Sequence, residues 1–476
     1  MDDKFYITTP IYYINDKPHI GHATTTIVAD VLARFYRQHG DDVLFLTGID
    51  ENSQKTVDAA KKAGEDLPAY TDRMALMWEA TWENLGISNT DFIRTTEPRH
   101  IETVKDIWGR IDAAGDIYLG TYEGLYCKGC EEFKKEDELI DGLCPIHKTE
   151  PEVVKEQNYF FRLSNYQKAL LDYYEANPEF VAPANRFNEV KAFVERGLED
   201  VSISREARDW GIPVPKDENQ KIYVWFVALI NYVSAVGVEW WEQHPADIHF
   251  MAKEIARFHA ILWPAMLLSA GLPLPHQIGV LGFLTNDGVK ISKSLGNAIN
   301  PLDLTAKYGN DALRYFLLRE IPFGQDGDFS ESKMKERYNS DLANGLGNFA
   351  ARVLTLAEKE QLNMGTLDAE FEGQIAAMKL AVDTKTKNFH FHEALAAVWS
   401  ALAFGDRYVN EKKVWAITDL KQREQALFNL VTLLDAIAVA LLPFLPDASQ
   451  KISAALVWDH DVLKAKKIEI LFPRVN

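Results

Sequence analysis

Short apolar runs and stretches of helical period alternate at the start of the chain. The run at residues 5–8 is rich in β-forming residues and predicts a strand, and the run at 41–46 predicts a second, buried strand. Between them the pattern becomes helical at Gly21 and stops at Gly40, with apolar residues at helical spacing at Ile27, Val31, Leu32 and Phe35. A strand–loop–helix–strand unit of this kind predicts an α/β domain that binds ligands where its strands end.

The last third of the chain has a different pattern, which is helical throughout after Phe329. Two sets of apolar residues each share one helical face, namely Leu395, Val398, Trp399 and Leu402, and then Leu427, Leu430, Leu434 and Ile437. Pro443 and Pro446 end the second of these helices. The pattern predicts an α-helical bundle of roughly 140 residues.

Composition places the chain among soluble globular proteins. It has 476 residues, of which 47% are hydrophobic and 25% charged, enough for several domains with their own cores. The first residues lack the basic and apolar regions of a signal peptide. The longest apolar stretch, 261–274, is broken by Pro264 and Pro273 and is too short to span a bilayer. We expect a cytoplasmic protein that does not enter a membrane.

The net charge of −19 argues mildly against RNA as a partner. Phosphate binding depends on a local basic surface, however, and the total charge does not measure such a surface. RNA binding therefore stays open at this point.

Two short motifs carry candidate chemistry. The first, P-H-I-G-H at residues 18–22, lies where the predicted helix begins, and a helix start attracts phosphate through its N–H groups and dipole. His19 and His22 could donate hydrogen bonds to phosphate oxygens, and Gly21 lets a nucleotide approach the backbone closely. Asp50 follows the second predicted strand and should lie near them. Alone, the motif could be a chance match.

The second motif, K-I-S-K-S, occupies residues 290–294 and follows the turn signal Asn286-Asp287-Gly288. Two lysines that flank a serine on a loop suit the neutralisation of a leaving pyrophosphate. Together and in this order, the two motifs resemble the ATP site of class I aminoacyl-tRNA synthetases. The resemblance implies adenylation of a carboxylate by ATP with Mg²⁺, and an ATP site formed by His19, Gly21, His22, Lys290, Ser292 and Lys293, of which the histidines and lysines are catalytic.

All three cysteines fall in one short segment with the spacing C-x2-C-x13-C-x2-H, formed by Cys127, Cys130, Cys144 and His147. Three thiolates and one imidazole make a closed tetrahedral set, typical of one structural Zn²⁺. Unligated buried thiols are the alternative, and a catalytic zinc would need an open coordination position. A zinc knuckle inserted between two halves of a catalytic domain resembles the methionyl-tRNA synthetase family.

Three further segments resemble the methionine pocket of that family. The resemblance implies side-chain contacts from Ile11 and Tyr13, from Trp225, Ala228, Leu229 and Tyr232, and from Ile255, Phe258 and His259. Asp50 would take the ammonium group. An aromatic-rich cavity suits a thioether, with Tyr13 or His259 as a polar donor to the sulfur atom.

Four positions depart from the family pattern. Asn52 stands where a histidine is common, Val227 where an aspartate is common, Ala252 where a glycine is common and Leu281 where a histidine is common. Asn52 can form hydrogen bonds but cannot carry a proton in catalysis, so no role is assigned to it.

The helical third resembles the anticodon-binding domain of the family. The resemblance implies that Asn348 and Arg352 contact anticodon bases and that Trp415 stacks on one of them, which is how unpaired bases are commonly read. No appended dimerisation domain follows, so we expect a monomer.

The resemblance implies a class I Rossmann-like catalytic domain that is split by a zinc-bearing connective insertion and followed by an α-helical anticodon-binding bundle. The expected ranges are 1–115 and 223–278 for the two catalytic halves, 116–222 for the insertion, 279–335 for the lysine-loop domain and 336–476 for the bundle. The expected reaction joins L-methionine to tRNA(Met), including the initiator, through methionyl-adenylate. Alternatives are a class I synthetase for another amino acid such as cysteine, a non-catalytic tRNA-binding paralogue and a small-molecule nucleotidylyltransferase.

Overall fold

The structure is a computed structural model that describes residues 4–130, 132–134, 136–206, 210–291, 298–360, 362–460 and 462–475. Contacts between residues divide the chain into two compact units. The first comprises Met1–Pro18, Asp42–Glu83 and Ser88–Leu281, and the second comprises His19–Asp41, Asn84–Ile87 and Gly282–Asn476. This division is coarser than the four expected domains with their five ranges, whose boundaries stay a prediction.

The first unit is built on a parallel six-stranded sheet with the order β3-β2-β1-β12-β13-β7. The strands are β1 (Lys4–Tyr13), β2 (Asp42–Asp50), β3 (Asp91–Arg94), β7 (Val181–Ala182), β12 (Ile248–Ala252) and β13 (Gln277–Leu281). Both predicted strands are present and longer than their apolar runs. Their continuous apolar sequences fit a parallel sheet that is covered on both faces. The expected α/β fold is confirmed.

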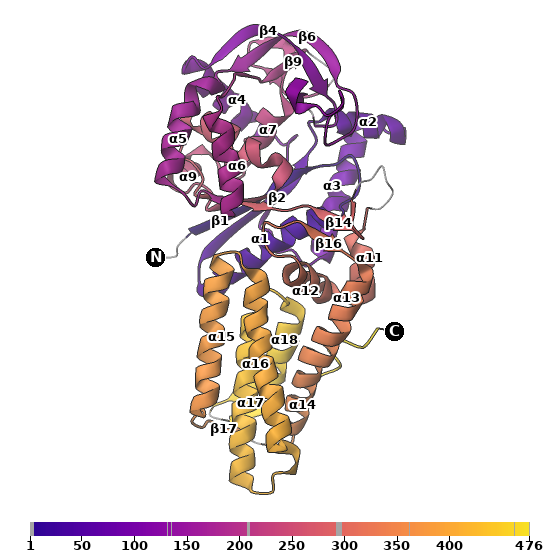
Figure 1. Ribbon diagram of the computed structural model, residues 1–476, viewed down its shortest axis with the longest axis vertical. Helices are drawn as coiled ribbons and strands as arrows, with labels where there is room; N and C mark the ends of the chain where they lie inside the picture. The colour runs from indigo at the N-terminus through magenta and orange to yellow at the C-terminus, as the bar shows by residue number, and fades with distance from the viewer. Residues whose placement is uncertain are drawn as a thin grey trace. The chain divides into compact units, whose positions relative to one another are not determined.

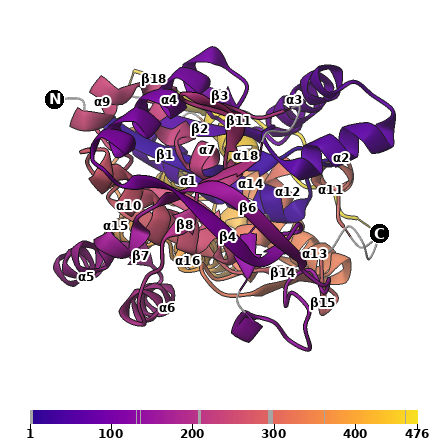
Figure 2. The same ribbon diagram turned by 90° about the horizontal axis from the view of Figure 1, so that it is seen from above.

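Helices pack on this sheet and complete its core. They are α2 (Gln54–Ala63), α3 (Leu67–Asn84), α4 (Pro98–Ala113), α5 (Gln167–Ala176), α6 (Ala184–Glu195), α7 (Val224–Leu229), α8 (Asn231–Val236), α9 (Val238–Gln243) and α10 (Trp263–Ser269). Helices α5 and α6 lie side by side (Figure 2). Large aromatic side chains such as Trp241 and Trp263 are fully buried here and account for much of the apolar area removed from water.

The segment expected as an insertion, 116–222, contains two antiparallel sheets, whereas its strand β7 belongs to the parallel sheet of the catalytic core. Long strands β4 (Ile117–Cys127) and β6 (Glu152–Phe161) pair along their length, flanked by β5 (Glu132–Lys134) and β8 (Val201–Ser202) (Figure 1). A second small sheet contains β9 (Ser204–Glu206), β10 (Pro213–Val214) and β11 (Asp217–Ile222). Asp116, directly before β4, accepts hydrogen bonds from the Tyr166 hydroxyl and, at 2.7 Å, from Ser269 Oγ of α10. These bonds fasten the start of the insertion to the catalytic core.

The second unit is mainly helical (Figure 1). Its α-helices are α1 (Ile20–His39), α11 (Pro301–Tyr308), α12 (Asn310–Glu320), α13 (Glu331–Arg337), α14 (Asn348–Ala357), α15 (Ala369–Lys387), α16 (Phe391–Lys412), α17 (Leu420–Leu441) and α18 (Pro446–Ala455), and a π-helix spans Tyr338–Gly347. The predicted bundle is confirmed, and all members of its two apolar sets except the partly exposed Trp399 are buried. The short strands β17 (Leu362–Asn363), β18 (Leu456–Asp459) and β19 (Val462–Ala465) were not predicted.

Helix α17 is the one described helix long and apolar enough to cross a membrane by length and composition. In the bundle, 72% of the most apolar 18-residue stretch of this helix is buried inside the structure. Its composition therefore follows from its place in a protein core.

Within the second unit, a fully buried ion pair joins α1 to α12. Arg314 Nη1 of α12 lies 2.7 Å from Asp30 Oδ2 of α1, and the two side chains are 1% and 0% exposed. Arg314 also donates to the carbonyl oxygens of Phe444 at 2.8 Å and Pro443 at 2.9 Å, just after α17. Arg34 Nε lies 2.7 Å from the same Asp30 oxygen. Each of these charges is paired, which is the condition for burying it.

Removing one partner should leave the other charge buried without full compensation. We expect Arg314→Met to lower the free energy of unfolding by about 3–5 kcal/mol, measured by denaturant titration with circular dichroism. Asp30→Asn in the same chain should restore part of this loss. The surface-pair variant Arg110→Met should cost less than about 1 kcal/mol. A similarly small loss in Arg314→Met would contradict a stabilising role for the pair.

Candidate active site and metal centre

The H-x-G-H motif forms the N-terminal cap of α1. His19 is the capping residue, and its Nδ1 accepts from the Gly21 N–H at 3.1 Å, while the His19 N–H donates to His22 Nδ1 at 3.2 Å. The two rings are stacked with centroids 3.7 Å apart. Because both Nδ1 atoms accept, each neutral ring carries its proton on Nε2. The cap thus presents Nε2–H groups beside a helix start, as anion binding requires.

A steric constraint within the cap also favours glycine at position 21. A Cβ at this position would lie 3.0 Å from Cε1 of His19 and press on the ring that caps the helix. A larger residue would therefore disturb the histidine pair as well as the approach of a ligand.

The segment before the lysine loop is a tight hairpin in the second unit. Strands β14 (Leu284–Asn286) and β15 (Val289–Lys290) are joined through Asp287 at φ 48° and Gly288 at φ 76°, so the predicted turn is confirmed. Asp328 of β16 (Gly327–Phe329) fixes the hairpin by accepting from Thr285 Oγ1 at 2.6 Å and Gly288 N at 2.7 Å. Lys290 is its last residue. Ser292 and Lys293 lie outside the described residues.

An aromatic cluster at the carboxyl end of β1 gathers residues from three segments of the first unit. The Trp225 and Phe258 rings stack with centroids 4.0 Å apart, and the Tyr13 ring meets Trp225 edge-on at 6.4 Å. Ile11, Ile255 and Ala228 pack in the same cluster. Leu229 and Tyr232 are buried in the adjoining core. The sequence-predicted methionine residues thus lie in one region, although only the resemblance pointed to it.

Tyr232 and His259 form a buried pair within this region. The Tyr232 hydroxyl oxygen is 2.7 Å from His259 Nε2, and His259 Nδ1 is 3.0 Å from the Ile255 carbonyl oxygen. Burial lowers the pKa of His259 to about 4, so the ring is neutral. A carbonyl only accepts, so the proton is on Nδ1 and Tyr232 donates to Nε2.

This tautomer leaves neither nitrogen of His259 with an N–H to offer to a sulfur atom. The expectation that His259 donates to the substrate is therefore wrong for this arrangement, because its single proton is bound to the Ile255 carbonyl. The ring instead holds the Tyr232 hydroxyl in place. The Trp225 indole N–H is buried and has no hydrogen-bond partner among the described residues.

Asp50 ends β2 and is 2% exposed. Its register partner on β1 is Tyr13, and its Oδ1 accepts from the Asn52 N–H at 2.8 Å. The next residue, Glu51, has a fully buried side chain bound by Arg94 Nε at 3.0 Å and Nη2 at 2.7 Å. Sequence reasoning missed this pair. The sequence feature that could have revealed it is an acidic and a basic residue at the ends of two strands, which the structure shows to be neighbours.

The four residues that depart from the family pattern are buried or lie at strand ends. Val227 is fully buried, Leu281 is 6% exposed at the end of β13, and Ala252 ends β12. Asn52 is 7% exposed, and its Nδ2 has no hydrogen-bond partner among the described residues.

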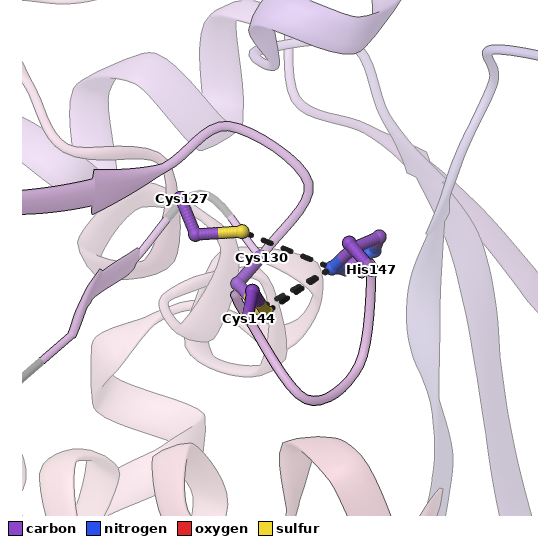
Figure 3. Close-up of side chains that lie close together, drawn as sticks. All are labelled: Cys127, Cys130, Cys144 and His147. Carbon is purple, nitrogen blue, oxygen red and sulfur yellow. Dashed lines mark hydrogen bonds between the residues drawn. The ribbon is translucent and has the colours of Figure 1, made fainter. Parts of the chain in front are cut away.

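The three cysteines and His147 converge at the end of β4 (Figure 3). Cys130 Sγ lies 3.6 Å from Cys144 Sγ and 3.4 Å from His147 Nδ1, while Cys127 and Cys144 Sγ are each 3.9 Å from that nitrogen. A tetrahedral metal with bonds of about 2.3 Å to sulfur and about 2.0 Å to nitrogen would place such atoms about 3.6–3.8 Å apart. The four side chains therefore fit a tetrahedral metal ion.

Gly129 makes this convergence possible. A Cβ at Gly129 would lie 2.3 Å from Cγ of His147, well inside contact distance, so any side chain there would displace the imidazole. Cys127 and Cys144 are buried, and Cys130 is partly exposed.

The expected anticodon residues lie on the second unit. Asn348 begins α14 and is exposed, and Arg352 follows one turn later. Arg352 donates to Asp406 Oδ1 at 2.5 Å and Asn410 Oδ1 at 2.7 Å, both on α16. Trp415 lies just after α16 in a short 3-10 helix and is 52% exposed. An exposed tryptophan is available for stacking.

Comparison with known proteins identifies the family. The family described as "tRNA synthetases class I (M)" matches residues 5–150 and 134–354. The methionine–tRNA ligase of Thermotoga maritima is 44% identical over 468 residues, which cover 94% of this chain and 74% of that protein. The chain belongs to the methionyl-tRNA synthetase family. The Streptomyces coelicolor methionine–tRNA ligase is also 44% identical and is covered over 89% of its length.

Solved structures of the methionyl-tRNA synthetase family agree in fold. The Mycobacterium tuberculosis methionyl-tRNA synthetase bound by methionyl-adenylate has a TM-score of 0.95 and 38% identity, covering 99% of this chain and 100% of that one. The free-state structure of the same enzyme has a TM-score of 0.85 and 36% identity, covering 100% and 99%. The expected class I architecture is thereby confirmed.

Proposed function

We propose that the protein is a methionine–tRNA ligase. It activates L-methionine with ATP to methionyl-adenylate and pyrophosphate, and it then transfers methionine to the 3′ end of tRNA(Met), including the initiator. The aromatic cluster of Tyr13, Trp225 and Phe258 beside Asp50, in a member of this family, carries the proposal. The structural relatives with methionyl-adenylate support it.

Activation needs charge neutralisation more than covalent chemistry. The methionine carboxylate attacks the α-phosphate of ATP in line, and negative charge accumulates on the phosphates as pyrophosphate leaves. We assign the Nε2–H groups of His19 and His22, together with Lys290 and Lys293, to this charge. Gly21 and Ser292 complete the ATP-binding set, and Mg²⁺ accompanies ATP.

Methionine recognition follows from an aromatic pocket with few polar groups. The unbranched, polarizable side chain packs against the stacked pair of Trp225 and Phe258 and against the apolar residues Ile11, Ala228, Leu229 and Ile255. Tyr232, held by His259, gives the pocket its polar surface, and the Asp50 carboxylate binds the ammonium group.

Pyrophosphate exchange with each of the twenty amino acids tests the assigned reaction. Methionine should support exchange and the others should not. Lys293→Ala and His22→Asn should lower the rate about 10²- to 10³-fold because each removes a donor to developing charge. The exposed Lys451→Ala should match the wild type. Stronger exchange with another amino acid would overturn the substrate, and exchange that survives both active-site variants would overturn the assigned roles.

Tyr232→Phe tests how the pocket tells sulfur from a methylene group. Loss of the hydroxyl leaves His259 Nε2 buried without a donor and makes the pocket more apolar. The KM for methionine should rise about tenfold, with a smaller change in kcat. Preference for methionine over its methylene analogue norleucine should fall, measured by exchange with each. An unchanged preference would remove Tyr232 from the pocket.

For the cysteine cluster we propose one structural Zn²⁺ held by Cys127, Cys130, Cys144 and His147. The thiolate-rich, four-coordinate set supports zinc, and it leaves no open position for catalysis. The ion would stabilise the end of β4 and the loop that follows, where few apolar residues are available to form a core.

Metal analysis and one glycine variant test this centre. The purified protein should hold about one zinc ion per chain, and chelation should lower its thermal midpoint. Gly129→Ala should lose the metal because the new Cβ meets the His147 ring, whereas Gly109→Ala, where a Cβ meets nothing within 4 Å, should keep it. A full zinc content in Gly129→Ala would contradict the assigned ligands.

For tRNA we propose that Asn348 and Arg352 bind anticodon bases and that Trp415 stacks on one of them. The exposed side chains of Asn348 and Trp415 support this assignment. Asp406 and Asn410 orient the Arg352 guanidinium in advance of binding.

A further inference from the structure

His249 is a buried titratable side chain of the first unit to which the proposed reaction assigns no role. It lies on β12 and is fully buried, and burial lowers its pKa well below the ordinary value, so the ring is neutral. Its Nδ1 lies 2.7 Å from Oγ1 of Thr8, whereas its Nε2 has no hydrogen-bond partner among the described residues. A buried imidazole with one unpaired nitrogen costs stability, which points to a role beyond packing.

The strand register places Thr8 directly beside His249. The two residues are register partners on the parallel strands β1 and β12, and both are fully buried. Register partners on neighbouring strands point to the same face of a sheet, so the hydroxyl reaches the imidazole while the backbone pairing stays regular. Rotation of a histidine ring about its Cβ–Cγ bond is only weakly restricted by the side chain itself. The hydrogen bond to Thr8 therefore fixes the plane of the His249 ring.

The fixed ring supports the face of Tyr232. The centroids of the His249 and Tyr232 rings are 4.1 Å apart and their planes are inclined by 33°, which is close contact between two flat groups. Two hydrogen bonds hold other parts of Tyr232. Its hydroxyl oxygen lies 2.7 Å from His259 Nε2, and its carbonyl oxygen accepts from the Tyr6 hydroxyl at 2.8 Å. His249 supplies the support that these two bonds lack, against the flat side of the ring.

We propose that His249, held by Thr8, is a positioning residue that sets the specificity of the methionine pocket through Tyr232, an inference that rests on the proposed function. Tyr232 is the residue that gives this pocket its polar surface. Methionine and norleucine differ only by a sulfur atom in place of a methylene group, so the polar group must lie at a fixed place to separate them. Such precision requires supporting side chains that are themselves locked by packing and hydrogen bonds.

The two residue types suit this supporting role. A neutral imidazole is flat and carries one nitrogen by which it can be anchored, whereas a phenyl ring is flat but has no anchor. Threonine offers a hydroxyl on a β-branched side chain whose own rotation is restricted. The Thr8–His249 pair thus converts the register of two strands into a fixed orientation of the Tyr232 ring.

Discrimination between methionine and norleucine tests the inference. The ratio of kcat/KM for the two amino acids in pyrophosphate exchange does not depend on the fraction of enzyme that is folded. Thr8→Val keeps the shape and removes the hydroxyl, so this ratio should fall about three- to tenfold, the effect of losing one neutral hydrogen bond. Thr8→Ser keeps the hydroxyl and should stay within about twofold of the wild type. Thr386→Val, at a buried threonine of α15 whose hydroxyl has no partner among the described residues, should leave the ratio unchanged.

A double-mutant cycle shows whether the effect passes through Tyr232. Tyr232→Phe has already lost the hydroxyl, so adding Thr8→Val should lower the ratio little further, whereas independent effects would multiply. His249→Phe keeps a ring without its anchor and should match Thr8→Val. An unchanged ratio in Thr8→Val, a multiplied loss in the double variant, or an equal loss in Thr386→Val would overturn the inference.

Absence of methionine-dependent exchange in the wild type would overturn the proposed function instead. Crystal structures of the wild type and Thr8→Val then still test the support. The Tyr232 ring should shift relative to His259 in the variant, and an unchanged position would overturn the inference.

Discussion

In a parallel sheet the carboxyl ends of all strands lie on the same side, and in the first unit polar side chains gather at these carboxyl ends. Tyr13, Asp50 and Arg94 end three neighbouring strands, β1, β2 and β3. The strands themselves are apolar because helices cover both faces, so the edge is where polar side chains can gather without breaking the core. The buried Glu51–Arg94 pair holds the chain just beyond Asp50 and fixes where that carboxylate lies.

Buried histidines in the first unit are kept neutral, and this decides what they can do. Burial lowers the pKa of His249 well below its ordinary value and the pKa of His259 to about 4. A neutral imidazole has one donor and one acceptor nitrogen, so its fixed neighbours determine which nitrogen carries the proton. In His259 both nitrogens are satisfied by Ile255 and Tyr232. The pair is therefore held rigidly beside the Trp225 ring, which suits the discrimination between similar side chains that we propose for this region.

The insertion contributes two separate groups of polar side chains at the ends of its strands. At the end of β4 lies the Cys₃His cluster for which we propose one Zn²⁺, and coordination there would take the place of a hydrophobic core, because the surrounding loop is mostly polar. At β9 and β11 the chain places Arg205 and Lys221 around a pocket that Asn52 also lines. The Asn52 amide cannot replace a histidine as a proton carrier, and its buried Nδ2 has no hydrogen-bond partner among the described residues.

The sequence by itself determined the elements with a strong local signal. Apolar runs and helical period located β1, α1, β2 and the bundle, and the fixed spacing of Cys127, Cys130, Cys144 and His147 was enough to predict that these four side chains converge. Only the tertiary structure decided which distant residues meet. The His259 tautomer depends on Ile255 and Tyr232, the Glu51–Arg94 pair on the order of strands, and the Asn52 pocket on the approach of the insertion. These features come from long-range packing and hydrogen bonding, which a local pattern does not encode.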